Sequence, residues 1–260
     1  MASRDLAGVT RRGFVGAAAA TVAVIPLARR ADAAIAPNLA GRWSTIYPWP
    51  DVAIHLSLLP SSTPAKARLL SFSDDGVPGL KDRNPGFSKS YIVEIPTNER
   101  PQSQPWIYVP NNSTNLFCSG HTILPDRRVL AMGGHVANYY GTSDINFFSE
   151  QPTPGWATQT NALNAGRWYP SVISLPNNDV LVVSGTIAGS NDINPLPQIW
   201  QTSAGGGLRD LRTASLKLKT YPKIFVLPDG RVASVGTEQL TRYLNTSGTG
   251  SWSSGPEVLR

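Results

Sequence analysis

The chain of 260 residues has almost no cysteine and no long hydrophobic run. Cys118 stands alone, so no disulfide can form within the chain. The longest apolar stretch, AAAATVAVIPLA, is shorter than the roughly 20 residues that a membrane-spanning helix needs. No cluster of Lys and Arg interleaved with aromatic residues occurs, so nucleic acid is not an expected partner. These absences exclude a disulfide scaffold, a membrane span and a basic nucleic-acid-binding module.

The N-terminal residues have the pattern of an export signal. The pair Arg11 and Arg12 in TRRGFVG precedes the apolar run, and ADAA follows it as a small-residue cleavage site. The arginine pair is typical of the twin-arginine export route. We therefore expect residues 1–34 to be a twin-arginine signal peptide, residues 35–260 to fold, and the protein to be secreted or periplasmic. Five arginines and two aspartates of this segment account for half of the net charge of +6.

An internal repeat dominates the rest of the chain. FCSGHTILPDRRVLAMGG, RWYPSVISLPNNDVLVVSG and KTYPKIFVLPDGRVASVG align on Leu124, Leu175 and Leu227, at spacings of 51 and 52 residues. Each segment is an apolar run, a polar turn and a second apolar run, which predicts a β-hairpin. The turn position held by Gly230 favours a left-handed backbone, and Arg127 at the equivalent position would cost about 1 to 2 kcal/mol there.

Two further strands per unit, several of them ending near a tryptophan, complete a four-stranded repeat. A period near 50 residues with four strands predicts an all-β, kelch-type β-propeller. We expect about four blades, at residues 42–110, 111–162, 163–212 and 213–260. Kelch propellers usually have six or seven blades, so this one is expected to be incomplete and the chain to be a fragment.

The repeat register brings three residues into correspondence. Cys118, Tyr169 and Tyr221 each lie six residues before the leucine of their Leu-Pro step. The first strand of each propeller blade lines the central axis, so equivalent positions of adjacent blades lie close together. Cys118 and Tyr169 are therefore expected to be neighbours in space.

LFCSGHTILPD, followed one repeat later by GRWYPSVISLPNNDVLVVSG, resembles the galactose oxidase and glyoxal oxidase family of copper radical oxidases. The resemblance implies a seven-bladed kelch-type propeller, usually with a C-terminal immunoglobulin-like domain. It also implies that Cys118 and Tyr169 are joined by a thioether bond, and that this modified tyrosine is catalytic, binds copper and stores a radical. A small primary alcohol, aldehyde or carbohydrate would be oxidised while dioxygen is reduced to hydrogen peroxide.

The sequence departs from this family in its copper ligands. The family's tyrosine followed directly by histidine does not occur here, and His55, His121 and His135 fall in early repeats where the family has no ligands. A tryptophan that stacks on the radical ring in some members is also missing from GTIAGSND, after the third repeat's hairpin. We expect later blades to supply these groups, and this chain alone to hold no copper and to have little or no oxidase activity.

Other interpretations of the same residues remain open at this stage. A lone buried cysteine is most often a small hydrophobic residue, and Tyr169 or Trp168 could simply pack, although Trp168 could also shield a radical. Arg167 could pair with a carboxylate near the axis. The alternative function is a non-catalytic kelch-type module that binds carbohydrate or protein through its loops. A purely structural repeat has no feature in its favour.

Overall fold

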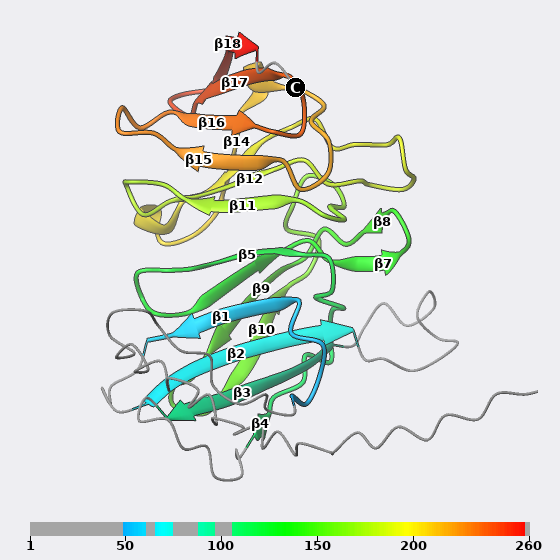
Figure 1. Ribbon diagram of the computed structural model, residues 1–260, viewed down its shortest axis with the longest axis vertical. Coiled ribbons are helices and arrows are strands. Elements are labelled where there is room, and N and C mark those ends of the chain that lie inside the picture. Colours follow the sequence, from blue (N-terminus) through cyan, green and yellow to red (C-terminus); the bar gives the residue numbers. More distant parts are fainter. Residues whose placement is uncertain (1–48, 61–65, 75–87, 97–105, 258–260) are drawn as a thin grey trace, which may run out of the picture. The chain divides into compact units, whose positions relative to one another are not determined.

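The computed structural model describes residues 49–60, 66–74, 88–96 and 106–257, all within one unit spanning Ile46–Arg260 (Figure 1). The expected signal peptide lies outside these residues. The described chain is all-β, with two short 3₁₀ turns, η1 (Thr202–Ala204) and η2 (Arg212–Ala214). No helix in the described part is long and apolar enough to span a membrane.

Four antiparallel sheets of four strands follow one another along the chain. Sheet 1 contains β1 (His55–Leu59), β2 (Lys66–Asp74), β3 (Ser88–Pro96) and β4 (Trp106–Tyr108). Sheet 2 contains β5 (Gly120–Ile123), β6 (Val129–Met132), β9 (Ile145–Ser149) and β10 (Gly155–Gln159). Sheet 3 contains β11 (Ser171–Ser174), β12 (Val180–Val183), β13 (Gln198–Trp200) and β14 (Leu208–Asp210). Sheet 4 contains β15 (Lys223–Val226), β16 (Val232–Val235), β17 (Leu240–Asn245) and β18 (Ser251–Glu257). A small hairpin of β7 (His135–Ala137) and β8 (Tyr140–Gly141) projects from the β6–β9 connection (Figure 1).

The three Leu-Pro hairpins predicted from the repeat are confirmed. β5 pairs with β6, β11 with β12 and β15 with β16, each around a turn that begins at the repeat leucine. The fourth turn residue is left-handed in all three, with φ of 74° at Arg127, 67° at Asn178 and 83° at Gly230. Arg127 also donates from Nη2 to the carbonyl of Pro60 at 2.7 Å, which offsets part of its conformational cost.

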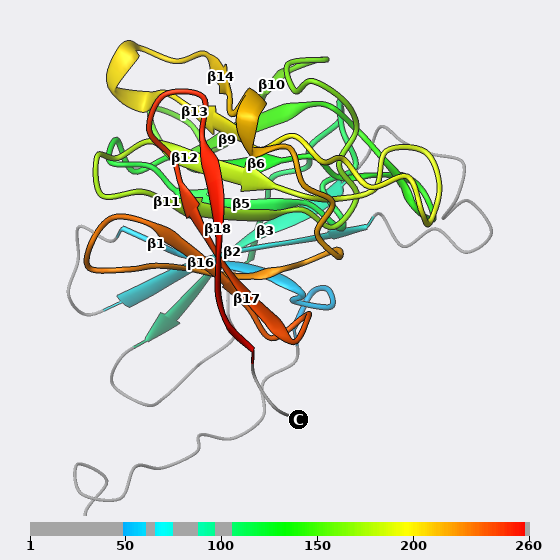
Figure 2. The same ribbon diagram turned by 90° about the horizontal axis from the view of Figure 1, so that it is seen from above.

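The core consists of three apolar layers, one between each pair of successive sheets. The second strands of sheets 2 and 3 are buried on both faces, because alternate side chains enter different layers. In β6, Val129 and Ala131 face sheet 1, whereas Leu130 and Met132 face sheet 3. The inner strands β5, β11 and β15 follow one another from sheet to sheet (Figure 1), and in the view from above β11 lies over β5 (Figure 2). The residues just before these three strands therefore lie close together.

Candidate functional site

Three residues at matching positions precede the inner strands. Cys118, Tyr169 and Tyr221 each lie two residues before β5, β11 and β15 respectively. All three have the left-handed backbone conformation, with φ of 64°, 60° and 44°. This conformation costs a residue with a Cβ about 1 to 2 kcal/mol, so the surrounding structure must hold it in place. We call these three residues the hub positions.

Hydrogen bonds between sheets hold the hub positions. The Tyr169 N–H donates to the Cys118 carbonyl at 2.8 Å, and the Tyr221 N–H donates to the Tyr169 carbonyl at 2.8 Å. The Cys118 N–H in turn donates to Nε2 of His55, on β1, at 3.1 Å. Each hub residue is thus hydrogen-bonded to the preceding sheet. The side chains at the three hub positions therefore lie close to one another.

The Cys118 side chain is fully buried next to Tyr169, and hydrogen bonding between the thiol and the phenol contributes to the pKa shift of each group. Burial raises the pKa of the Cys118 thiol to about 12, although the bond from Tyr169 acts in the opposite direction. Burial, and then the bond to Cys118, raise the pKa of the Tyr169 phenol. Both groups are therefore protonated near neutral pH, and joining them requires an oxidant that removes two hydrogen atoms.

The ring of Tyr169 is covered on both faces. Trp168 stacks on it at a centroid distance of 3.9 Å and an interplanar angle of 18°. Tyr221 stacks on it at 4.5 Å and 19°. Two rings that lie this close and nearly parallel to a third must occupy its opposite faces. Trp168 and Tyr221 therefore enclose the Tyr169 ring between them.

Trp168 is itself held by groups from the β7–β8 hairpin. Its indole N–H donates to Nδ1 of His135 at 3.0 Å. Tyr139, in the turn between β7 and β8, contacts the other part of the indole with ring centroids 4.9 Å apart at 55°. Backbone hydrogen bonds with Thr186, at 2.8 and 2.9 Å, fix the main chain of Trp168. The stack is thus anchored from sheets 2 and 3 together.

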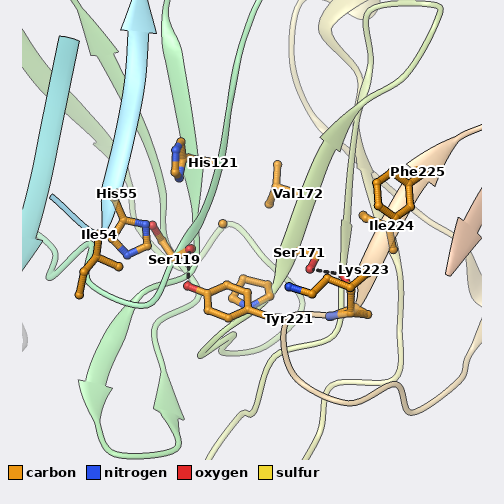
Figure 3. A pocket seen from close by; sticks show the side chains of 13 residues that line it. Ile54, His55, Ser119, His121, Ser171, Val172, Tyr221, Lys223, Ile224 and Phe225 are labelled. Carbon is orange, nitrogen blue, oxygen red and sulfur yellow. Dashed lines mark hydrogen bonds between the residues drawn. The ribbon is translucent and has the colours of Figure 1, made fainter. Parts of the chain in front are cut away.

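A pocket of about 420 Å³ lies beside the hub positions, between the inner strands (Figure 3). Tyr221 and Lys223 enter it from sheet 4, and His55 and His121 line the opposite side (Figure 3). The Tyr221 hydroxyl donates to the Ser119 carbonyl at 3.2 Å. Tyr221 therefore borders the pocket and stacks on Tyr169 at the same time.

The histidines have structural partners rather than a common ligand. His55 stacks on Phe72 with ring centroids 4.8 Å apart, and burial, followed by the neighbouring His121, lowers its pKa to about 3. A neutral His55 is what the hydrogen bond from the Cys118 N–H requires, because Nε2 must accept. His55 is therefore uncharged at neutral pH. Burial also lowers the pKa of His121.

Arg167 does not pair with a carboxylate among the described residues, contrary to one interpretation of the sequence. Its buried guanidinium donates to the carbonyls of Ser184 and Leu196 at 2.8 and 2.6 Å. Gln198 accepts from Arg167 at 3.2 Å and donates to Asp210 at 2.9 Å, so it stands between the two charges. Burial lowers the pKa of Arg167 to about 9, against the attraction of Asp210. The side chain is still charged at neutral pH, and it fixes the segment that leads into Tyr169.

Sequence reasoning assigned no role to Tyr221, His55 or Tyr139. Tyr221 shares the register of Cys118 and Tyr169, so the repeat offered a signal for it. His55 precedes the clear repeats, and Tyr139 lies in an irregular connection. No local pattern marks either of them, because their partners come from other sheets.

Comparisons with known proteins add to this geometry. No family model matches the chain. A WSC domain-containing protein of Arthroderma benhamiae is 31% identical over 161 residues, which are 57% of this chain and 17% of the relative. An aldehyde oxidase GLOX of Vitis pseudoreticulata is 26% identical over 165 residues, 62% of this chain and 29% of the relative. A solved fungal alcohol oxidase of the AA5 family, in complex with copper, has a TM-score of 0.54 at 16% identity, covering 78% of this chain and 43% of that one.

The chain is thus similar to members of the galactose/glyoxal oxidase family. The four antiparallel sheets and the similarity to the solved oxidase are consistent with a β-propeller-like fold of that family. The chain spans 17% and 29% of the lengths of the two curated relatives. What a whole protein of this kind does is therefore a matter for proposal.

The described residues match only part of a copper site. Cu(II) favours imidazole nitrogens together with anionic ligands, and Tyr169 offers one phenol. Within the described ranges no three or more His, Cys, Asp and Glu side chains gather in a group that could hold a metal. Nε2 of His55 and Nδ1 of His135 already accept hydrogen bonds from Cys118 and Trp168. A complete ligand set would need groups from outside the described residues.

Proposed function

We propose that this chain supplies the Cys118–Tyr169 redox pair of an exported copper radical oxidase of the galactose/glyoxal oxidase type. The observation that carries the proposal is the place of Cys118 and Tyr169 at matching positions of adjacent sheets, where the Tyr169 N–H donates to the Cys118 carbonyl at 2.8 Å and the thiol is fully buried. The pair is the one that the family resemblance implies, and the similarity to the aldehyde oxidase GLOX and to the AA5 alcohol oxidase supports it independently.

The proposed modification joins the Cys118 sulfur to a carbon of the Tyr169 ring. One hydrogen leaves the thiol and one leaves the ring, and the two electrons pass to an oxidant such as dioxygen, which becomes hydrogen peroxide. A ring that bears sulfur is easier to oxidise than an unmodified phenol. The stacked rings of Trp168 and Tyr221 shield such a ring from solvent.

The proposed overall reaction converts a primary alcohol to an aldehyde, or a hydrated aldehyde to an acid, with dioxygen reduced to hydrogen peroxide. Each turnover takes two electrons and two protons from the substrate and passes them to one dioxygen molecule. Copper would supply the second oxidising equivalent, with Tyr169 as one ligand. The imidazole ligands would come from further blades of a kelch-type propeller, in which sheets 1 to 4 are four blades of an expected seven.

The proposed location is outside the cytoplasm, by twin-arginine export of residues 1–34. Dioxygen is available there, and a cysteine engaged in a thioether bond is not exposed to disulfide exchange. The substrate class would be a small alcohol, aldehyde or carbohydrate.

Intact mass and peptide mapping test the proposal. After incubation with an excess of the one-electron oxidant hexachloroiridate(IV), which requires no copper site, the wild-type protein should lose two hydrogen atoms, and proteolysis should release the peptides of Cys118 and Tyr169 as one joined species. Cys118→Ser and Tyr169→Phe should each remain unchanged in mass. As a further control, Tyr221→Phe keeps the stacked ring and should still form the joined peptide.

A wild-type protein that stays unmodified in excess oxidant would contradict the oxidase proposal. The pocket beside Tyr221 would then favour the alternative function, a non-catalytic kelch-type module that binds carbohydrate or protein. A glycan array read with wild-type protein and with Lys223→Ala, whose side chain enters the pocket, would test that alternative.

A further inference from the structure

A continuous line of aromatic contacts connects the half-buried Tyr169, the partner of the buried Cys118, to the exposed Tyr139. Tyr169 stacks on Trp168 at 3.9 Å, and Trp168 contacts Tyr139 at 4.9 Å between ring centroids. Tyr139 is 46% exposed, whereas Trp168 is 9% exposed and Cys118 is not exposed at all. The line therefore begins in solvent and ends at a sulfur that solvent does not reach.

The rings along this line are held in place rather than loosely packed. Tyr139 has a left-handed backbone, with φ of 68°. Its carbonyl accepts hydrogen bonds from the Thr186 hydroxyl at 2.7 Å and from the Gly189 N–H at 3.1 Å. The same Thr186 also pairs with the Trp168 backbone. One residue of the connection between β12 and β13 therefore holds the backbones of both aromatic residues. A strained backbone that is held by several contacts is a common property of functional segments.

The chemistry of the pair requires two electrons to leave the buried Cys118 sulfur and the Tyr169 ring. Tyrosine and tryptophan rings can each give up one electron, and rings in contact allow that electron to pass from one to the next. We propose that Tyr139 and Trp168 form an electron relay that carries oxidising equivalents from a one-electron acceptor at the surface to Tyr169. The inference rests on the proposed function, because it takes Tyr169 as the ring that is oxidised.

The steps balance for each electron. The surface acceptor takes one electron from Tyr139, whose phenol proton goes to water. The resulting radical takes one electron from Trp168 and one proton from water, so that Tyr139 returns to a phenol and Trp168 is left oxidised by one electron. Trp168 then recovers its electron from Tyr169, which loses a proton. A second electron leaves by the same route, and the Cys118 sulfur bonds to the Tyr169 ring. Two molecules of acceptor are reduced, and two protons are released in all.

The neighbouring Tyr140 provides a matched control. It follows Tyr139 directly in the chain and is 47% exposed, almost the same as Tyr139. Among the described residues no ring contact joins it to Trp168, so it is an exposed phenol outside the line. A substitution at Tyr140 therefore removes the same chemical group from the same surface without interrupting the line.

The experiment uses copper-free protein and hexachloroiridate(IV), a soluble one-electron oxidant. Rapid mixing followed by proteolysis and mass spectrometry measures the rate at which the joined Cys118–Tyr169 peptide forms. Tyr139→Phe keeps the ring and its packing but removes the oxidisable phenol, and it should slow the joining by about tenfold, equivalent to about 1.4 kcal/mol in activation free energy. Trp168→Phe should slow it comparably, and Tyr140→Phe should match the wild type.

The outcomes separate the relay from the function on which it rests. Equal rates in wild type and Tyr139→Phe would overturn the relay, because electrons would then leave Tyr169 directly. Equal slowing by Tyr139→Phe and Tyr140→Phe would also overturn it, since any surface phenol would serve. A wild-type protein that forms no joined peptide would overturn the proposed function, and the relay with it. Unchanged thermal unfolding of Tyr139→Phe ensures that the rate reports on electron transfer.

Discussion

The inner hairpins carry a left-handed residue at both ends, and the two ends use it differently. At the turn end, Arg127, Asn178 and Gly230 adopt this conformation within a hairpin that closes on itself. At the hub end, Cys118, Tyr169 and Tyr221 adopt it under hydrogen bonds that come from the preceding sheet. The turn is thus a local structure, whereas the hub exists only where sheets meet.

The comparison shows why the two ends accept different residues. A turn that needs only a positive φ is served by glycine or asparagine, and arginine is tolerated at a cost. No glycine occurs at the three hub positions, although glycine would suit their backbone. There the side chains contribute the thiol, the stacked rings and the hydroxyl bond to Ser119, which glycine would remove. The hub end keeps a non-glycine residue in all three sheets, whereas the turn end has glycine in one of them, and this difference marks the hub as the end at which side chains matter.

The largest effect is expected just before the hub, at Arg167. Arg167→Met removes the donors of the buried carbonyls of Ser184 and Leu196, and each unsatisfied group costs about 1 to 3 kcal/mol. The free energy of unfolding, measured by urea denaturation, should fall by about 3 kcal/mol. As a control, Arg212→Met, at an exposed side chain, should have little effect. A similar loss in both variants would mean that Arg167 is not a special support of the hub.

The next effect concerns the pH dependence of the link between Cys118 and sheet 1. The pKa of His55 is lowered to about 3 in the folded protein, so the unfolded chain binds more protons as the pH falls below about 6.5. The stabilisation from neutral His55 is present above that pH and is lost as the pH falls towards the folded pKa. Between about pH 7 and about pH 5 the loss should reach about 2 kcal/mol.

His55→Gln tests this assignment, because glutamine keeps an acceptor but does not titrate. Urea denaturation at several pH values should give a shallower decline for His55→Gln than for the wild type. An equal slope in the two proteins would assign the decline to other groups, among which His121 also has a lowered pKa.

A smaller effect is expected from glycine at a hub position. Tyr221→Gly relieves the left-handed backbone but removes the stacking on Tyr169 and the bond to Ser119, so it should destabilise the protein by about 2 kcal/mol. Urea denaturation measures the change. A neutral or stabilising result would mean that the Tyr221 side chain contributes no more to stability than a side chain at the turn end does.

The smallest effect has the opposite sign, at the turn end. Arg127→Gly relieves the same backbone conformation and loses only one exposed hydrogen bond, to Pro60, so it should stabilise the protein by about 0.5 kcal/mol. Thermal unfolding of this variant and of Tyr221→Gly, measured together, compares the two ends directly. Destabilisation by Arg127→Gly would mean that the bond to Pro60 outweighs the strain.

Much of the fold was predictable from the sequence because its causes are local. The Leu-Pro turns and the flanking apolar runs predict the hairpins of sheets 2, 3 and 4, and an all-β chain follows from their repetition. The same register predicts that Cys118 and Tyr169 are neighbours, since a repeat places equivalent residues at equivalent points of successive sheets.

The tertiary structure alone decided which groups surround that pair. Trp168 stacks on the tyrosine beside it in sequence, Tyr139 reaches it from an irregular connection, and His55 binds the Cys118 N–H from sheet 1. Arg167 is satisfied by carbonyls and amides, although the sequence suggested a carboxylate. Hydrophobic period and turn chemistry determine a strand and its hairpin, but a contact between side chains of different sheets depends on how those sheets pack, and no local pattern records it.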